Sequence, residues 1–277
     1  MKPIKRSKLR LTLGKAYYIG KRYMEWYFGK TNFAKKIQKD TLPFMIFKHQ
    51  TPLLRQLKEV DMWLQLNKIK NLKIAIQKIN GIMIYPGETF SYWKLIGCPT
   101  SKKGYVEGMV LFYGGFKPGV GGGLCQLSNL IYWMTLHTPL EISERHRHSY
   151  DIFPDSKRSQ PFGSGATCAY NYLDLRIHNS TEQPYQLNIY VTNDYLVGEW
   201  TSIAQPQYSY EIYEKEHKIT QEYWGGYMRH NLIHRRVFNE NRELIDDQYV
   251  TENHALMMYQ PFLESGRDEL EDEGRIL

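Results

Sequence analysis

The segment GVGGGLCQLSNLIYWMTLHTPL, residues 119–140, carries the strongest structural signals in the chain. Four of its first five residues are glycines, Pro139 stands near its end, and the residues between are mostly apolar. Glycine permits backbone conformations that other residues avoid, and the residue before a proline disfavours the helical conformation. The pattern predicts a glycine-rich loop that leads into a helix over residues 124–137, placed centrally in the fold.

Cys125 lies at the start of this predicted helix. Unpaired N–H groups in a first helical turn favour negative charge, so we expect the pKa of the thiol to be lowered. The same amides would stabilise an oxyanion, and glycines such as Gly122 and Gly123 let the backbone approach a bound ligand. Cys125 is therefore a candidate nucleophile; a tight turn around a small buried cysteine is the alternative.

Helices are also predicted nearer the N-terminus. Aromatic and apolar residues at helical spacing over residues 15–39 predict an amphipathic helix that breaks near Gly29. A longer apolar pattern predicts a second helix from about Pro52 to Ile79, ended at Asn80-Gly81 by a left-handed cap.

Strands are predicted over much of the remaining sequence. Short apolar runs separated by turn residues occupy residues 82–110 and 140–200, and a Tyr-rich stretch follows over residues 205–262. In LDLRIHN, residues 173–179, apolar and polar residues alternate, which is typical of a half-exposed strand. The expected fold class is α+β, with N-terminal helices followed by antiparallel strands.

The two ends of the chain differ in charge. Residues 1–40 contain 12 lysines and arginines and two acidic residues, a net charge of +10, so the other residues carry −3 of the total +7. We interpret residues 1–40 as a basic amphipathic arm, residues 41–262 as the main domain and residues 263–277 as an unstructured acidic tail. A basic arm without a nucleic-acid-binding motif favours an anionic membrane surface as partner over nucleic acid.

The N-terminus does not have the pattern of an export signal. Its basic start is followed by Lys15, Lys21 and Arg22, which interrupt the apolar stretch that a signal peptide needs, and no stretch has the length of a membrane span. We expect a cytoplasmic protein that is peripheral to the inner face of the membrane.

The three cysteines, an odd number, argue against a disulfide framework. Cys125, Cys168, His146 and His148 would be the residues of a zinc site, but the sequence has none of the usual zinc-ligand spacings. We therefore expect neither a metal nor a cofactor.

A polar cluster, ERHRH at residues 144–148, supplies candidates for a general base. Alternate residues of a strand face the same side, so His146 and His148 would share a face and Arg147 would point away. Either imidazole would accept the Cys125 proton, and Arg145 would bind a substrate carboxylate. A polar surface strand is the alternative.

Four strings of residues occur in order along the chain: INGIMIYPGETFSYWKLIG, GYVEG, GGGLCQLSNLIYWMTLHTPLEISERHRHS and GATCAYNYLDLRIHN. Their content and order resemble the VanW family over residues 71–200. One position departs from the family pattern. Many members have Gly-x-Asp-Ala-Thr where this chain has Gly163-Ser164-Gly165-Ala166-Thr167, and an Asp at that position would orient the histidine.

The resemblance implies a role in peptidoglycan metabolism and glycopeptide resistance. Some larger, exported members are associated with L,D-transpeptidase activity, in which a cysteine thiolate attacks a peptidoglycan stem peptide. For this chain the resemblance implies that Cys125 is the nucleophile and that His146 or His148 is its base. Gln126 and Ser128 would hold the substrate pocket in shape. Peptidoglycan cross-linking takes place outside the membrane, which leaves open an exported protein, action on cytoplasmic precursors, or binding without turnover.

The predicted function is cysteine-dependent acyl transfer or hydrolysis on peptidoglycan stem peptides. The alternative is a non-catalytic accessory protein that binds peptidoglycan precursors or cell-wall enzymes. The two differ in the reactivity of Cys125, which in an enzyme should be alkylated near neutral pH faster than Cys98 and Cys168.

Overall fold

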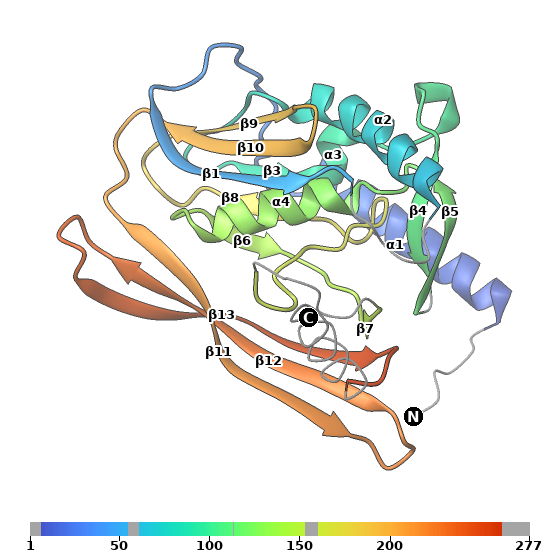
Figure 1. Cartoon of the computed structure of the whole chain (residues 1–277). Coiled ribbons are helices and arrows are strands. Elements are labelled where there is room, and N and C mark those ends of the chain that lie inside the picture. The colour runs from blue at the N-terminus through green and yellow to red at the C-terminus, as the bar shows by residue number, and fades with distance from the viewer. Residues whose placement is uncertain (1–6, 55–60, 113, 153–159, 262–277) are drawn as a thin grey trace, which may run out of the picture.

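The computed structural model describes residues 7–54, 61–112, 114–152 and 160–261, and its architecture is α+β, as predicted (Figure 1). The helices of these ranges are α1 (Lys8–Phe28), α2 (Met62–Ile79), α3 (Tyr92–Ile96) and α4 (Cys125–Leu136), with a 3-10 turn at Ser101–Lys103. The strands are β1 (Phe44–Pro52), β2 (Ile82–Ile84), β3 (Thr89–Ser91), β4 (Glu107–Phe112), β5 (Gly115–Val120), β6 (Glu141–Glu144), β7 (Tyr150–Asp151), β8 (Arg176–His178), β9 (Tyr185–Val191), β10 (Tyr195–Ser202), β11 (Ser209–Gln221), β12 (Tyr227–Phe238) and β13 (Leu244–Met257).

Helix α4 lies inside the fold because it is apolar on almost all sides. From Leu127 to Leu136 every residue except Asn129 is buried. The helix contacts β1 and β10 above it and β6 below it in the view of Figure 1. The predicted central helix is therefore confirmed, and its N-terminal end is set among strands from several parts of the chain.

The strands pair mainly in antiparallel fashion. One sheet has the order β1-β10-β9-β2, another has the order β3-β8-β6, and β4 and β5 form a hairpin. The long strands β11, β12 and β13 form a sheet on the opposite side of α4 from β1 and β10, with β7 paired parallel to β13 (Figure 1). These three strands confirm the prediction of further strands over residues 205–262.

Helix α2 is shorter than predicted. Strand β1 pairs with β10 as far as Pro52, which lies opposite Tyr195, and α2 begins at Met62. The predicted start of this helix at Pro52 is wrong because cross-strand pairing, which the local sequence does not report, determines the conformation there. The predicted end is confirmed, since α2 ends at Ile79 and Gly81 has a positive φ of 79°.

Strand β8 is buried on both faces. Asp174, just before it, is fully buried and Arg176 is 6% exposed, whereas the alternating sequence predicted exposure for both. The prediction is wrong because segments far away in the sequence cover these side chains. Arg176 pairs with Glu25 of α1 and lies over the Phe33 ring at 5.3 Å, and Asp174 accepts hydrogen bonds from Ser91 and Trp93.

The N-terminal region joins the main domain over part of its length. Helix α1 starts earlier than predicted, at Lys8, and ends at Phe28 with Gly29 as its C-cap, so the predicted break near Gly29 is confirmed. The helix predicted over residues 30–39 is wrong, because this segment instead bridges strands of the main domain. The backbone N–H of Ala34 donates to the Thr89 carbonyl group and that of Gln38 to the Gly81 carbonyl group. The boundary at residue 40 stays a prediction, and the tail at 263–277 lies outside the described residues. Within the described ranges, no helix combines the length and apolar character needed to cross a membrane.

Candidate functional site

The loop before α4 is held by contacts between backbone segments. Gly122 is buried against Gly108 of β4, so closely that a Cβ atom on Gly122 would collide with the Gly108 carbonyl group. Asn71 of α2 donates a hydrogen bond from Nδ2 to the Gly122 carbonyl oxygen at 2.9 Å. Gly123, with φ of 89°, lies against the side chain of Lys68. Both glycines therefore serve the packing of the loop, and their role in substrate binding stays a prediction.

Cys125 is the first residue of α4, and it is partly exposed. Burial raises the pKa of its thiol, and the backbone N–H groups of Cys168 and of Cys125 itself, which favour the thiolate, offset this only in part. The expectation of a lowered pKa is wrong because desolvation of the sulfur outweighs the two amides. The resting protein therefore holds Cys125 as a thiol beside backbone N–H donors.

Cys168 lies beside Cys125, and both are free thiols. Burial raises the pKa of Cys168 well above its usual range, and the neighbouring Cys125 and Asp174 add to the effect. The hydroxyl group of Ser128 hydrogen-bonds the Cys168 thiol and donates to the Ala166 carbonyl oxygen at 2.7 Å. Ser128, predicted to support the pocket, therefore ties α4 to the segment that carries Cys168. The sequence analysis considered Cys125 and Cys168 together only as residues of a zinc site and did not predict two free thiols side by side, although the position of Cys168 in GATCAYNYLDLRIHN was a signal for it.

Tyr92 and Asp174 complete the buried side of this cluster. Tyr92 donates from its hydroxyl group to the Leu124 carbonyl oxygen at 3.0 Å, and burial raises its pKa well above its usual range. Asp174 accepts from the Ser91 hydroxyl group at 2.5 Å and from the Trp93 N–H at 2.9 Å. Burial nevertheless raises the pKa of Asp174 to about 6. This carboxyl group was also missed, because its alternating sequence predicted a surface position.

Glu144 has the opposite electrostatic environment. Burial alone would raise the pKa of its carboxyl group, but hydrogen bonds from His146 and Arg22 and the charge of Arg22 lower it to about 2. Arg22, on α1, donates from its two terminal nitrogens at 2.8 and 2.6 Å. Asp174 donates its backbone N–H to the same carboxylate at 3.1 Å. Glu144 therefore remains ionised and connects α1 to the cluster around Cys125.

His146 and His148 do not lie on a strand. Strand β6 ends at Glu144, where it pairs with Arg176, and β8 begins at that residue, so no strand continues for His146 to pair with. His146 directs Nε2 to Glu144 at 2.9 Å, and its carbonyl oxygen accepts from the N–H of Thr167, next to Cys168. Burial and the charge of Arg147 lower the pKa of His148. Among the described residues, neither imidazole hydrogen-bonds the Cys125 thiol, so the dyad stays a prediction.

Arg145 and Gln126 are occupied by contacts within the chain. Arg145 donates from Nε to the Gly165 carbonyl oxygen at 2.9 Å, and its guanidinium group lies over the Tyr132 ring at 4.9 Å. Gln126 donates from Nε2 to the Thr51 hydroxyl group at 2.9 Å. Both side chains fix the surroundings of Cys125 in this structure, and substrate binding by them stays a prediction.

Asn129 fills the space that a side chain at position 165 would need. A Cβ atom on Gly165 would lie 2.6 Å from Asn129 Oδ1, which accepts from the Ala166 N–H at 2.8 Å. An aspartate at position 165 would therefore require Asn129 to move. In this chain the amide of Asn129 holds the backbone at the point where the expected motif has a carboxylate.

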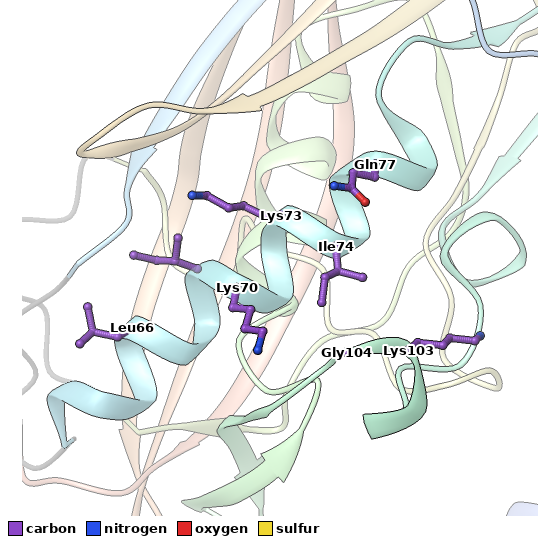
Figure 2. Close-up of a pocket in the computed structure, with 8 residues that line it drawn as sticks. Leu66, Lys70, Lys73, Ile74, Gln77, Lys103 and Gly104 are labelled. Carbon is purple, nitrogen blue, oxygen red and sulfur yellow. The ribbon is translucent and has the colours of Figure 1, made fainter.

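A pocket of about 660 Å³ lies away from these groups, on α2 (Figure 2). Figure 2 shows Lys70 and Ile74 on the side of α2 that faces Gly104. Its walls are formed by Leu66, Ile69, Lys70, Lys73, Ile74, Gln77, Lys103 and Gly104. None of the predicted site residues lines this pocket, so the pocket is not part of the candidate site around Cys125.

Comparison with known proteins supports the family expected from the motifs. The family model described as VanW like protein matches residues 67–201. The vancomycin B-type resistance protein VanW of Enterococcus faecalis is 32% identical over 227 residues, which cover 82% of this chain and 82% of that protein. The chain belongs to the VanW family.

A second relative matches a shorter part of the chain. The uncharacterized protein YoaR of Bacillus subtilis is 31% identical over 117 residues, 41% of this chain and 36% of that protein. No solved structure gives a significant match. The part matched by the VanW model runs from α2 to β10 and includes Cys125, Cys168 and Asp174, whereas α1 and β11 to β13 lie outside it.

Proposed function

We propose that this chain acts on peptidoglycan stem peptides through Cys125, as a thiol-dependent acyltransferase or hydrolase, and contributes to glycopeptide resistance. The observation that carries the proposal is that Cys125, a partly exposed residue, is the first residue of α4 and that the backbone N–H groups of Cys168 and of Cys125 itself favour its thiolate. Such donors stabilise a thiolate and the oxyanion that forms when the thiolate attacks a carbonyl group. The name of the Enterococcus relative supports the biological context.

The reaction would proceed in two acyl-transfer steps. Cys125 loses its proton to a base, and its sulfur attacks the carbonyl carbon of a stem-peptide amide. The C–N bond breaks, the amine leaves with a proton, and a thioester remains on Cys125. An amine of a second stem, or water, then attacks the thioester, the C–S bond breaks, and the thiol is restored.

His146 is the proposed base. Because burial keeps Cys125 protonated at rest, the reaction needs a group that accepts the thiol proton when substrate is bound. Glu144 holds the imidazole of His146 at 2.9 Å, and Thr167 binds its carbonyl oxygen beside the Cys168 segment. A carboxylate bonded to one ring nitrogen stabilises the imidazolium that forms when the other nitrogen takes a proton.

The alternative function is non-catalytic binding of peptidoglycan precursors or cell-wall enzymes. The raised pKa of Cys125 favours it, together with the fact that no described imidazole hydrogen-bonds the thiol. On this alternative the cluster of buried polar groups would only stabilise the fold around a binding surface.

Mass spectrometry of the purified full chain incubated with defined stem peptides separates the two functions. The acyl-transfer proposal predicts an acyl adduct on the peptide that contains Cys125, absent in C125S and retained in C168S. Binding of stem peptides without any adduct, with the same affinity for wild type and C125S, would support the non-catalytic function and overturn the enzymatic one.

A further inference from the structure

Helix α1 is attached to the body of the protein by one face only. On that face Arg22 binds Glu144, Glu25 binds Arg176 at 2.5 Å, and Trp26 is buried. The carbonyl group of Trp26 also accepts from Lys94 Nζ at 2.7 Å. All of these residues belong to the second half of α1, and the N-terminal half projects beyond the rest of the fold (Figure 1).

The opposite face of α1 is apolar and exposed. Residues that follow one another at intervals of three or four lie on one side of a helix. Leu9, Leu13 and Tyr17 follow this spacing, Met24 lies seven residues, or two turns, beyond Tyr17, and Tyr27 three beyond Met24; all five are between 59% and 71% exposed. We call these five side chains the α1 stripe. Phe28 beside it is 79% exposed, and Leu11 and Tyr18 are exposed on the projecting half. Contiguous exposed apolar side chains of this kind indicate an interaction surface.

Cations accompany the stripe, and acidic residues do not. Arg10 and Lys21 border it and Lys15 lies on the same projecting helix, all three exposed. Glu25, the sole acidic residue between positions 7 and 28, is bound to Arg176 and Arg22. A partner for this surface must therefore offer an apolar layer next to negative charge.

We propose that α1 lies flat on a lipid bilayer with anionic headgroups. The α1 stripe would enter the boundary between headgroups and acyl chains, where the amphipathic tyrosine rings are at their most stable. Arg10 and Lys21, which border the α1 stripe, would contact the phosphates. This inference does not depend on catalysis by Cys125. It does imply that Glu144 and its neighbours lie on the side of α1 that faces away from the lipid.

Co-sedimentation of the full chain with vesicles tests the charge requirement. Wild type should bind vesicles that contain phosphatidylglycerol, bind vesicles of pure phosphatidylcholine weakly, and be released by salt. Because each cation near an anionic surface contributes about fivefold to partitioning, the double variant R10Q/K21Q should bind about twentyfold to thirtyfold more weakly. The matched variant K70Q/K73Q, which removes two lysines of the α2 pocket, should bind like wild type.

A second pair of variants tests the apolar contact. L13S/Y17S should lose binding to anionic vesicles, whereas Y223S/L244S, which alters exposed residues far along the chain, should keep it. Equal effects of the two pairs, or equal binding of wild type to both kinds of vesicle, would overturn the proposal. So would concentration-dependent self-association that L13S/Y17S abolishes while vesicle binding is lacking, since the stripe would then bind a second copy of the chain.

Discussion

The two ends of α4 bury ionisable groups in different ways. At the C-terminal end, His137 stacks on Phe47 with ring centroids 3.9 Å apart, and burial lowers its pKa to about 4. At the N-terminal end, Cys125, Cys168 and Asp174 lie together, each with a pKa raised by burial. Burial shifts pKa values at both ends, so a shifted pKa does not by itself mark a functional site.

The difference lies in what surrounds the shifted groups. His137 donates one hydrogen bond from Nδ1 to the Tyr210 carbonyl oxygen at 3.1 Å, and its ring contacts are aromatic. The N-terminal end instead combines the thiol of Cys125, backbone N–H groups beside it and a carboxylate, Glu144, that stays charged. Backbone N–H donors and a charged carboxylate therefore distinguish the candidate site from the other end of the same helix, since Cys125 and His137 are both only partly exposed.

Removing the charge of Glu144, near the N-terminal end of α4, should have the largest effect on the free energy of unfolding. E144A would leave Arg22 and Arg176 without their shared buried partner, and breaking a buried ion pair costs about 3–5 kcal/mol. Urea unfolding measures the change in free energy of unfolding. E211A, which breaks an exposed ion pair with Arg236, is the matched control and should cost below about 1 kcal/mol. Similar costs for the two variants would contradict the importance given to Glu144.

The two ends should also respond to acid with opposite signs. The pKa of His137 is lowered from 6.5 to about 4, so the unfolded chain takes up its proton first and stability is lost as the pH falls through this window. The pKa of Asp174 is raised from 3.8 to about 6, so the folded chain takes up its proton first and stability is gained over nearly the same window. Each contribution is about 2–3 kcal/mol at most.

Variants that do not titrate separate these contributions. Compared with wild type, H137Q should lose less stability between pH 6.5 and pH 4, and D174N should lose more. Urea unfolding at several pH values across this range provides the measurement. If both variants change the slope in the same direction, one of the two assigned pKa shifts has the wrong sign.

Restoring the family aspartate should disturb the N-terminal end to a smaller extent. G165D forces a side chain against Asn129, and overpacking of this kind costs about 1–3 kcal/mol. The double variant G165D/N129A should recover part of the loss, since it opens the space that the new carboxylate needs. Thermal unfolding of the two single variants and the double variant gives the coupling. Strictly additive losses would show that Asn129 is not the obstacle.

The smallest effect concerns the thiol in the absence of substrate. Because burial raises the pKa of Cys125, its alkylation should reach half of its maximal rate above about pH 8.5, the usual value for cysteine, and not near neutral pH as the sequence led us to expect of an enzyme. On the proposed mechanism the thiol is activated only when substrate is bound. H146Q should leave this profile nearly unchanged, because His146 is bonded to Glu144 in the resting protein. Mass spectrometry after timed iodoacetamide treatment follows Cys125 alone. A half-maximal rate near neutral pH would contradict the raised pKa.

Sequence reasoning succeeded where the structure is determined locally. The glycines before Cys125 and Pro139 after the helix predicted α4, and Asn80-Gly81 predicted the end of α2. It failed where the partner of a residue lies far away in the chain. The alternation around Asp174 and Arg176 suggested a surface strand because nothing nearby indicates that Glu25, 151 residues away from Arg176, supplies its counter-charge.

For the candidate site, the sequence predicted which residues take part better than it predicted their local structure and surroundings. The family motifs identified Cys125, Ser128 and His146, all of which lie around the start of α4 or are joined to it by hydrogen bonds. The expected strand at His146 and the expected low pKa of Cys125 were both wrong. Each depends on a quantity that a single sequence does not contain, namely which strand pairs with β6 and how much solvent reaches the sulfur.

The ion pairs of α1 set an order of assembly during synthesis. Arg22 is made 122 residues before Glu144, and Glu25 is made 151 residues before Arg176. Since domains fold as their residues leave the ribosome, α1 must wait for both partners with its aromatic residues uncovered. For that interval a bilayer close to the ribosome would compete with the body of the protein for the same helix. Once Glu144 and Arg176 have been made, their ion pairs with Arg22 and Glu25 bind one face of α1 to the body, and the α1 stripe on the other face remains free to contact lipid.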